Sequence, residues 1–255
     1  MLFSVALPQT QGFEYYDPPD GSVKYMEFRL IYRGPLPAEG SGGGRAKEKH
    51  LLRKQFHRQL LELWRQHPNL RAQSEGRFVK LERPDPDTIY LDRASRPSSK
   101  AIVIPALGSL DADPGAKTWV EHLADDHQRC GGRFVPLVSS AGGFTCSLDI
   151  LFLRRDNPGG LIVKGKDGGD IDNRIKVLFD GLKMPETMSD LGGLPLEENP
   201  FYCLLEDDSL ITSVNVITDR LLVEKGAEEK VNDVHLIIHV TLVNPSALFA
   251  GNRLV

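Results

Sequence analysis

Two groups of acidic residues carry the clearest chemical signal in this sequence. Asp170 and Asp172 lie two residues apart after Gly168 and Gly169, and the triplet Glu206-Asp207-Asp208 follows further along the chain. In an extended turn, side chains at i and i+2 point the same way, so the first two carboxylates would lie close together and repel each other. A divalent cation relieves such repulsion, and oxygen ligands suit Mg²⁺ or Mn²⁺. The triplet would add a third carboxylate, which metal-dependent phosphodiester chemistry requires.

The same residues also have a plain structural interpretation. Asp172 would then only cap a helix, Asp170 would only belong to a turn, and the triplet would be a solvated turn ahead of a strand. Two aspartates separated by one residue are common in loops, so the first group alone does not decide between the two interpretations.

A helix follows the first acidic group. Asp172 and Asn173 are both good N-cap residues, and Pro185 limits how far the helix continues. The apolar residues after them recur at i, i+3, i+4 and i+7, which indicates one buried helical face: Ile175, Leu178, Phe179 and Leu182. The paired carboxylates therefore stand at the start of an anchored helix.

Taken together, the two groups resemble the RusA-type Holliday-junction resolvases. The resemblance lies in the pattern Asp170-x-Asp172-Asn173-x-x-Lys176-x-x-x-Asp180-x-Leu182, followed by Asp207-Asp208-Ser209-x-Ile211 at the start of a strand. It covers residues 165 to 243, with a weaker similarity over residues 24 to 66.

The resemblance implies a Mg²⁺-dependent endodeoxyribonuclease that acts on branched DNA. Asp170, Asp172 and Asp208 would be the metal-binding catalytic acids, and Lys176 would match the functional lysine. Lys176 would neutralise the scissile phosphate or orient the water; an ion pair with Asp172 or Asp180 is the structural alternative. Asn173 and Asp207 are candidates to hydrogen-bond a metal-binding carboxylate, and for Asn173 a simple cap is the alternative.

Two rival functions remain open. One is a nuclease of the same fold that cuts another DNA or RNA. The other is a protein that binds structured nucleic acid or a partner protein without cutting. Clustered carboxylates favour cutting, because a binding module gains nothing from acidic groups near phosphates.

Resolution of a four-way junction takes two opposed cuts, so the resemblance also implies a homodimer with two equivalent sites. The apolar residues from Leu236 to Leu242 would either pack across the dimer axis or be buried within one subunit.

Residues 45 to 66 predict a second, basic helix. Leu52, Phe56, Leu60 and Leu63 form its apolar face, whereas seven basic and two acidic residues between 45 and 65 give a local charge of +5. Such a helix would contact phosphates, and the candidate side chains are Lys49, Arg53 and Lys54. A solvated helix face is the alternative.

Composition sets further limits. The formal net charge of the 255 residues is −4, so any polyanion-binding surface must be local. Cys130, Cys146 and Cys203 are widely spaced and form no CxxC motif, which predicts free thiols in a reducing, cytoplasmic compartment. We recognise no signal peptide and no apolar run long enough to cross a membrane.

The overall pattern predicts an α+β fold with a mixed β-sheet flanked by helices, as a single domain over residues 1 to 255. Relative to the family, residues 67 to 132 would be an inserted block and residues 183 to 205 a long ordered loop. A further helix is expected over residues 117 to 129, stopped by Cys130-Gly131-Gly132, and strands 133 to 139 and 144 to 153 are expected to form a hairpin. The expected strands are residues 26–32, 77–81, 88–91, 101–105, 133–139, 144–153, 211–223 and 234–243.

Overall fold

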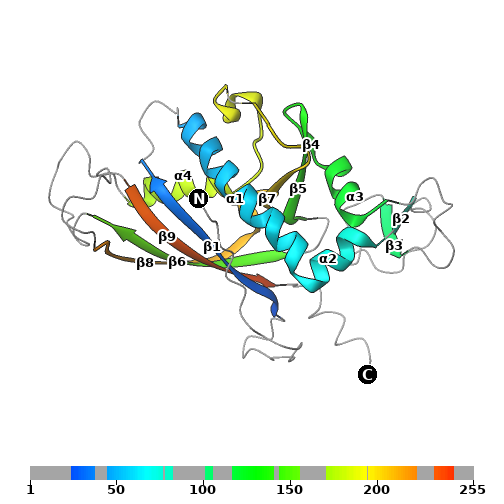
Figure 1. The fold of residues 1–255 in the computed structure, drawn as a ribbon, viewed down its shortest axis with the longest axis horizontal. Helices are drawn as coiled ribbons and strands as arrows, with labels where there is room; N and C mark the ends of the chain where they lie inside the picture. Colours follow the sequence, from blue (N-terminus) through cyan, green and yellow to red (C-terminus); the bar gives the residue numbers. More distant parts are fainter. Residues whose placement is uncertain are drawn as a thin grey trace, which may run out of the picture.

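The structure of the chain is a computed structural model. It describes residues 24–37, 45–76, 78–82, 101–105, 117–140, 144–155, 171–193, 195–222 and 233–243. Over these residues the predicted α+β fold is confirmed: helices flank a mixed β-sheet (Figure 1). The predicted strand at 88–91 lies outside the described residues.

The main sheet has four strands in the order β1-β9-β6-β8. Its strands are β1 (Lys24–Pro35), β9 (Asp233–Val243), β6 (Thr145–Arg154) and β8 (Ile211–Arg220). β9 pairs antiparallel with both β1 and β6, whereas β8 pairs parallel with β6. Alternate side chains of β9, from Val234 to Leu242, are fully buried, so this face of the sheet carries the core within one subunit.

Helix α1 (Ala46–Gln66) lies over the core face of the sheet (Figure 1). Its predicted apolar face is confirmed, because Leu52, Phe56, Leu60 and Leu63 are all buried. A second helix, α2 (Pro68–Glu75), was not predicted, and it begins at a proline. Proline fits the first position of a helix, since its missing N–H would have no partner there.

A second sheet has the order β4-β5-β7, with strands β4 (Gln128–Arg129), β5 (Gly132–Val138) and β7 (Phe201–Leu205). β5 pairs parallel with β7, and helix α3 (Trp119–Asp126) packs beside β5. The predicted hairpin between strands 133–139 and 144–153 is therefore wrong, because β5 and β6 lie in different sheets. The last five residues of β5 are all buried, as is usual for a strand covered on both faces.

Helix α3 is shorter than predicted, because it ends at Asp126 rather than at residue 129. The segment Cys130-Gly131-Gly132 does not stop the helix. It forms the tight turn between β4 and β5, with positive φ angles of 51° at Cys130 and 73° at Gly131. Positive φ at two successive residues is what a two-residue hairpin turn requires, and glycine adopts it without strain.

The predicted inserted block holds a two-stranded sheet, β2 (Phe78–Glu82) with β3 (Ala101–Pro105). The end of the block joins the main core, because Val120, Leu123 and Ala124 of α3 belong to the same hydrophobic cluster as β1 and β9. All three cysteines are free thiols, as predicted. None of the helices in the described part of the chain is long and apolar enough to cross a membrane.

Candidate functional site

The helix predicted after the first acidic group is α4 (Ile171–Leu182). Asp172 is exposed in its first turn, where its Oδ1 accepts a hydrogen bond of 2.7 Å from the backbone N–H of Asn173. Lys176 is exposed one turn later. The predicted ion pair between Lys176 and Asp172 or Asp180 does not form, and Asp170 lies outside the described residues.

The acidic triplet begins directly after β7 and leads into the short 3-10 helix η4 (Asp208–Leu210). Asp207 caps η4: its Oδ1 accepts a hydrogen bond of 2.9 Å from the backbone N–H of Ser209, and hydrogen bonding from Ser209 lowers the pKa of Asp207. Asp208 remains exposed, and its Oδ2 lies 3.6 Å from the Nζ of Lys183. Asp208 is thus the more exposed of the two aspartates.

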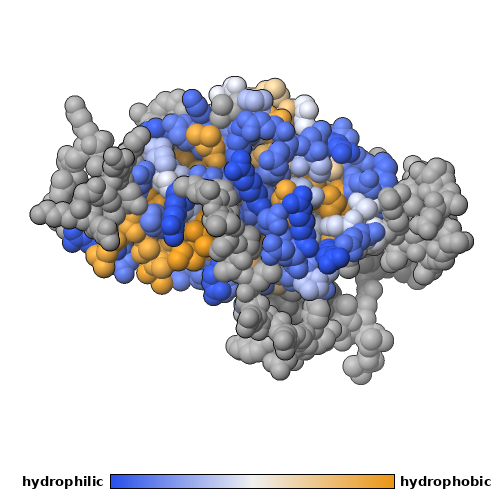
Figure 2. All heavy atoms as spheres, viewed as in Figure 1, coloured by the Kyte–Doolittle hydropathy of each residue, from blue (hydrophilic) through white to orange (hydrophobic). Residues whose placement is uncertain are grey.

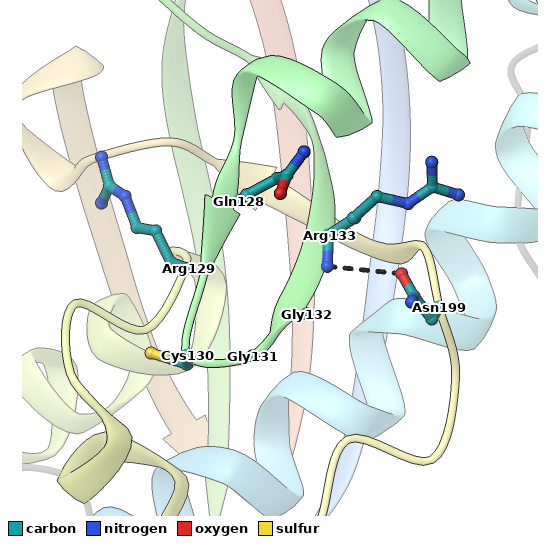
Figure 3. Close-up of a pocket in the computed structure, with 7 residues that line it drawn as sticks. All are labelled: Gln128, Arg129, Cys130, Gly131, Gly132, Arg133 and Asn199. Carbon is teal, nitrogen blue, oxygen red and sulfur yellow. Dashed lines mark hydrogen bonds between the residues drawn. The ribbon is translucent and has the colours of Figure 1, made fainter.

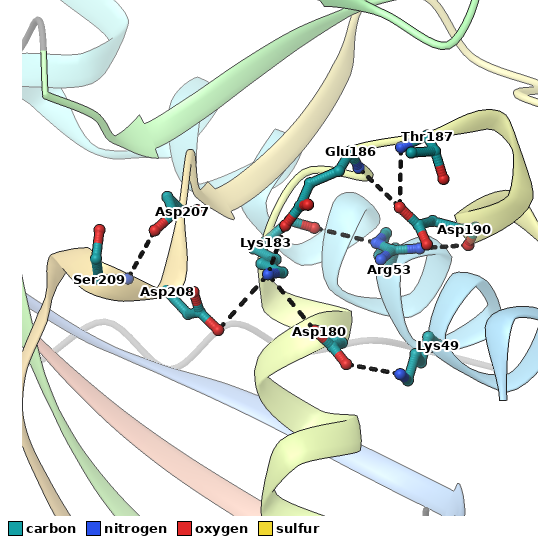
Figure 4. A network of polar contacts seen from close by, with 10 residues as sticks. All are labelled: Lys49, Arg53, Asp180, Lys183, Glu186, Thr187, Asp190, Asp207, Asp208 and Ser209. Atoms are coloured by element: carbon teal, nitrogen blue, oxygen red, sulfur yellow. Dashed lines mark hydrogen bonds and ion pairs between the residues drawn. The ribbon is translucent and has the colours of Figure 1, made fainter. Parts of the chain in front are cut away.

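Lys183 is the centre of a polar network that sequence reasoning missed (Figure 4). Its Nζ lies 2.9 Å from Glu186 Oε1 and 3.6 Å from both Asp180 Oδ1 and Asp208 Oδ2, and only 13% of its side chain is exposed. Burial acts to lower the pKa of Lys183, but the hydrogen bond to Glu186 and the three carboxylate charges outweigh it, so the pKa is raised. Lys183 is therefore a stable cation among three carboxylates.

The spacing of Asp180 and Lys183 is the signal that would have revealed part of this network. Asp180 lies one helical turn before Lys183 at the end of α4, whereas Glu186 lies three residues after Lys183, beyond the end of the helix. Neither spacing predicts the contact with Asp208, which depends on how β7 returns to the end of α4. The backbone N–H of Met184 donates to Leu205 O at 3.0 Å and fixes that return.

Helix α1 contributes Lys49 to the same network. Its Nζ lies 2.7 Å from Asp180 Oδ2, and a second α1 lysine, Lys54, pairs with Glu197 at 2.9 Å. Both lysines were predicted to contact phosphates, and that contact stays a prediction. The structure adds a condition to it, because a phosphate would have to compete with Asp180 and Glu197.

The surface role predicted for Arg53 is wrong. Arg53 is buried, with 4% of the residue exposed. Its guanidinium donates to the backbone oxygens of Lys183 at 3.0 Å and Asp190 at 2.9 Å. A basic side chain on a helix belongs to its charged surface only if it faces solvent. Here the end of α4 and the 3-10 helix η3 (Met188–Leu191) cover the guanidinium.

Close approach of α1 and α4 holds the network in place. A Cβ atom at Gly181 would lie 2.8 Å from the Cβ of Leu52, so only glycine fits at this crossing without movement. Gly192, which has a φ of +60°, approaches the backbone of Lys47 in the same way. The predicted loop of residues 183 to 205 is thus ordered against α1. It is shorter than predicted, because residues Phe201–Leu205 form β7.

The first residue of the triplet, Glu206, has a structural role. Its Oε2 accepts hydrogen bonds of 2.8 Å from both the backbone N–H and the Oγ of Ser140, and its Oε1 lies 3.7 Å from His127 Nε2. The hydrogen bonding to His127, which outweighs the effect of burial, lowers the pKa of Glu206 to about 2. This contact fixes the end of β7 immediately before Asp207 and Asp208.

The structure brings together only part of the predicted metal site. Asp172 precedes Lys183 by eleven residues, which corresponds to about 16 Å along a helix axis. Among the described residues, no group of three or more His, Cys, Asp or Glu side chains is placed to hold a metal ion. The convergence of Asp170, Asp172 and Asp208 stays a prediction, since Asp170 is not described.

A shallow pocket of about 350 Å³ lies at the turn between β4 and β5 (Figure 3). It is lined by residues 128 to 133 and by Asn199, whose Oδ1 accepts a hydrogen bond of 3.3 Å from the backbone N–H of Arg133. The side chains of Arg129 and Arg133 point away from each other, so they do not form one anion site. None of the acidic candidates that the structure describes lines this pocket.

Comparison with known proteins identifies no relative: no family model, no curated protein and no solved structure matches this chain.

Proposed function

We propose that this chain is a Mg²⁺-dependent endonuclease of the RusA type that cuts branched DNA. One observation carries the proposal: Asp208 is paired with Lys183 directly after α4, the helix that has Asp172 in its first turn and also carries Lys176. The second half of the sequence pattern therefore lies against the residue that follows the helix of the first half.

The donor atoms suit the proposed metal. Asp172 and Asp208 are both exposed, and carboxylate oxygens are the ligands that Mg²⁺ and Mn²⁺ prefer. Asp170 and Asp172 would hold the ion at the start of α4, and Asp208 would join them as a ligand only by moving toward them from the other end of the helix. The bound ion would activate the attacking water and stabilise the charge that develops on the phosphate.

Lys176 and Lys183 would have different roles in this site. Lys176 is exposed, so its ammonium is available to neutralise the scissile phosphate. Lys183 is occupied by Asp180, Glu186 and Asp208, and it offsets the repulsion among these carboxylates. Lys183 is thus a positioning residue for Asp208.

Cleavage of a labelled four-way junction in Mg²⁺ or Mn²⁺ tests the proposal. Asp170→Asn, Asp172→Asn and Asp208→Asn should each reduce the cleavage rate at least about 100-fold, because each removes a metal-binding charge. Glu75→Gln is the matched control, since Glu75 is an exposed acid on α2 that pairs with Arg71, and it should cut at the wild-type rate. Thermal unfolding followed by circular dichroism checks that the variants fold.

Each other result points to a rival. Tight junction binding without cleavage would identify a non-cleaving nucleic-acid-binding protein. Cleavage of other DNA or RNA, with intact junctions, would identify a nuclease of the same fold with a different substrate. Full activity of the Asp208→Asn variant would remove the basis of the proposal.

A further inference from the structure

The face of the main sheet that points away from the core carries a continuous apolar row. Ile31 pairs in register with Ile237, Ile237 with Leu151, and Leu151 with Ile217, so one aliphatic residue from each strand contributes. Ile217 is 58% exposed and Ile237 is 37% exposed. We call this surface the outer face. Figure 2 shows apolar atoms gathered at the lower left, where Figure 1 places β6 and β8.

Charged residues flank the apolar row on both sides. One neighbouring row pairs, in strand order, Arg29, His239, Asp149 and Asn215. The other pairs Arg33, His235, Leu153 and Asp219. Arg33, Asp149 and Asp219 are exposed and form no ion pair within the described part of the chain. These three charges thus remain available for a partner.

We propose that the outer face is the contact surface of a symmetric homodimer, with a two-fold axis that runs parallel to the strands between β9 and β6. The expectation of a dimer rests on the proposed function, but the surface and the axis follow from the strand register. Of the apolar residues from Leu236 to Leu242, Ile237 supplies this contact, because the even-numbered ones are buried within the subunit.

The register fixes which residues would meet. A two-fold axis along the strands keeps each row at its own level and reverses the order of the strands. Ile31 then faces the partner's Ile217, and Ile237 faces the partner's Leu151. In the flanking rows, Arg33 faces the partner's Asp219. The face is therefore complementary to itself in both apolar character and charge.

A two-fold axis along the apolar row would give a different result. It would place one flanking row over the other, so that Arg29 faces the partner's Arg33. Like charges placed opposite each other are destabilising, whereas the axis along the strands pairs opposite charges. The charge pattern therefore selects the axis along the strands.

The size of the face fits a dimer of moderate stability. Four strands spaced about 4.8 Å apart, over about nine residues of about 3.3 Å each, cover roughly 500 Å² per protomer. Two such faces bury roughly 1,000 Å², at the lower end of specific interfaces. We therefore expect a dissociation constant in the micromolar range.

This arrangement also places the two candidate sites on one side of the dimer. Asp208 directly precedes the first residues of β8, so it marks one end of the sheet. Rotation about an axis along the strands leaves that end unchanged, and both copies of Asp208 lie at the same end. A single branched substrate could then meet both sites, as two opposed cuts require.

Sedimentation velocity and light scattering from about 1 to about 100 µM, without DNA or metal, test the proposal across the expected affinity range. Ile217→Lys should weaken dimerisation at least about 30-fold, because two lysines enter the apolar row. Arg33→Asp and Asp219→Arg should each weaken it about tenfold, since each breaks two symmetric pairs. The double variant Arg33→Asp with Asp219→Arg re-forms both pairs in reverse and should recover to within about threefold of wild type. Met188→Lys, at a 64% exposed position on η3, is the control and should leave the dimer unchanged.

A wild-type protein that stays monomeric throughout that concentration range would overturn the proposal. So would a dimer that withstands Ile217→Lys and both charge reversals, which would indicate another contact, such as pairing along the edge of β8 that no described strand covers. Because these measurements use no DNA, their failure leaves the nuclease proposal standing. Equally, failure of junction cleavage leaves the dimer surface standing.

Discussion

The ammonium of Lys183 lies 3.6 Å from Asp208 Oδ2 and joins the end of α4 to the turn before β8. The same ammonium contacts Asp180 and Glu186, so one cation offsets three nearby carboxylates. This makes Lys183 a structural requirement for the acidic turn, whereas Lys176 is exposed and makes no such contacts with the described residues. The two lysines should therefore respond differently to substitution.

We expect Lys183→Met to lower the free energy of unfolding by about 1–3 kcal/mol, because it leaves three carboxylates without their shared partner. Lys176→Met should change it by less than about 0.5 kcal/mol, as is usual for an exposed side chain, but should reduce junction cleavage. Urea denaturation and the cleavage assay measure the two effects. Equal losses of stability in both variants would show that Lys183 has no special role.

Substitutions in α1 should separate structural from nucleic-acid contacts. Lys54→Ala should weaken junction binding and reduce the salt slope of log K by about 1, because one phosphate contact is lost. Its unfolding free energy should change by no more than about 1 kcal/mol, since the pair with Glu197 is exposed. A fluorescence anisotropy titration at several salt concentrations measures the slope.

Arg53→Met, unlike Lys54→Ala, should reduce stability and leave the salt dependence of binding unchanged. It leaves the buried oxygens of Lys183 and Asp190 without donors, so it should cost about 2–4 kcal/mol of stability. The salt slope of junction binding should not change in the folded fraction. A stable Arg53→Met variant with a reduced salt slope would return Arg53 to the binding surface.

Gly181→Ala should destabilise the protein although alanine is the better helix former. The new methyl group would lie 2.8 Å from Leu52 Cβ, and such overpacking costs about 1–3 kcal/mol against a propensity gain of about 1 kcal/mol. Combining it with Leu52→Ala should cost less than the sum of the two single changes, because the second change makes room for the first. A double-mutant cycle by urea denaturation measures this coupling, and strict additivity would rule out the close contact.

The pair of Glu206 and His127 should make stability depend on pH in both directions. The folded pKa of Glu206 is about 2, below its ordinary 4.5, so its contribution is complete above pH 4.5 and is lost as the pH falls toward 2. Burial acts to lower the pKa of His127, but Glu206 and Leu123 O outweigh it, so this pKa is raised above 6.5. The histidine contribution is therefore complete below pH 6.5 and is lost as the pH rises through the folded value.

The stability lost in Glu206→Gln should accordingly be greatest near about pH 5.5 and smaller near about pH 3 and about pH 9. Urea denaturation at these three pH values measures the difference from wild type, with Glu75→Gln as the exposed control. A difference that stays constant across the three values would show that the pair is not ionised in the folded protein.

Local periodicity accounts for what the sequence predicted well. The apolar spacing of α1 and the alternation in β9 are properties of single segments, and both were predicted. The hairpin prediction failed because strand pairing depends on partners distant in sequence, such as β5 with β7. A run of polar and glycine residues between two strands does not reveal whether they share a sheet.

In the candidate site, too, local patterns were predicted well and contacts between distant segments were not. The positions of Asp172 and Lys176 on α4 follow from the helix pattern, so the sequence was sufficient to place them. The roles of Lys183 and Arg53 depend on where η3 and β7 return to α4, which no local pattern encodes. Arg53 was predicted to be a surface residue because it is one of many basic residues in α1.

The order of strands in the main sheet has a consequence for how the chain folds during synthesis. β9 is the last of the described strands to be made, yet it lies between β1 and β6 and is the main-sheet neighbour of β1. β1 therefore cannot pair with β9 until about 200 further residues have been synthesised. Pairings that close such long loops form slowly, so the nascent chain exposes strand edges for most of its translation and depends on their protection from aggregation.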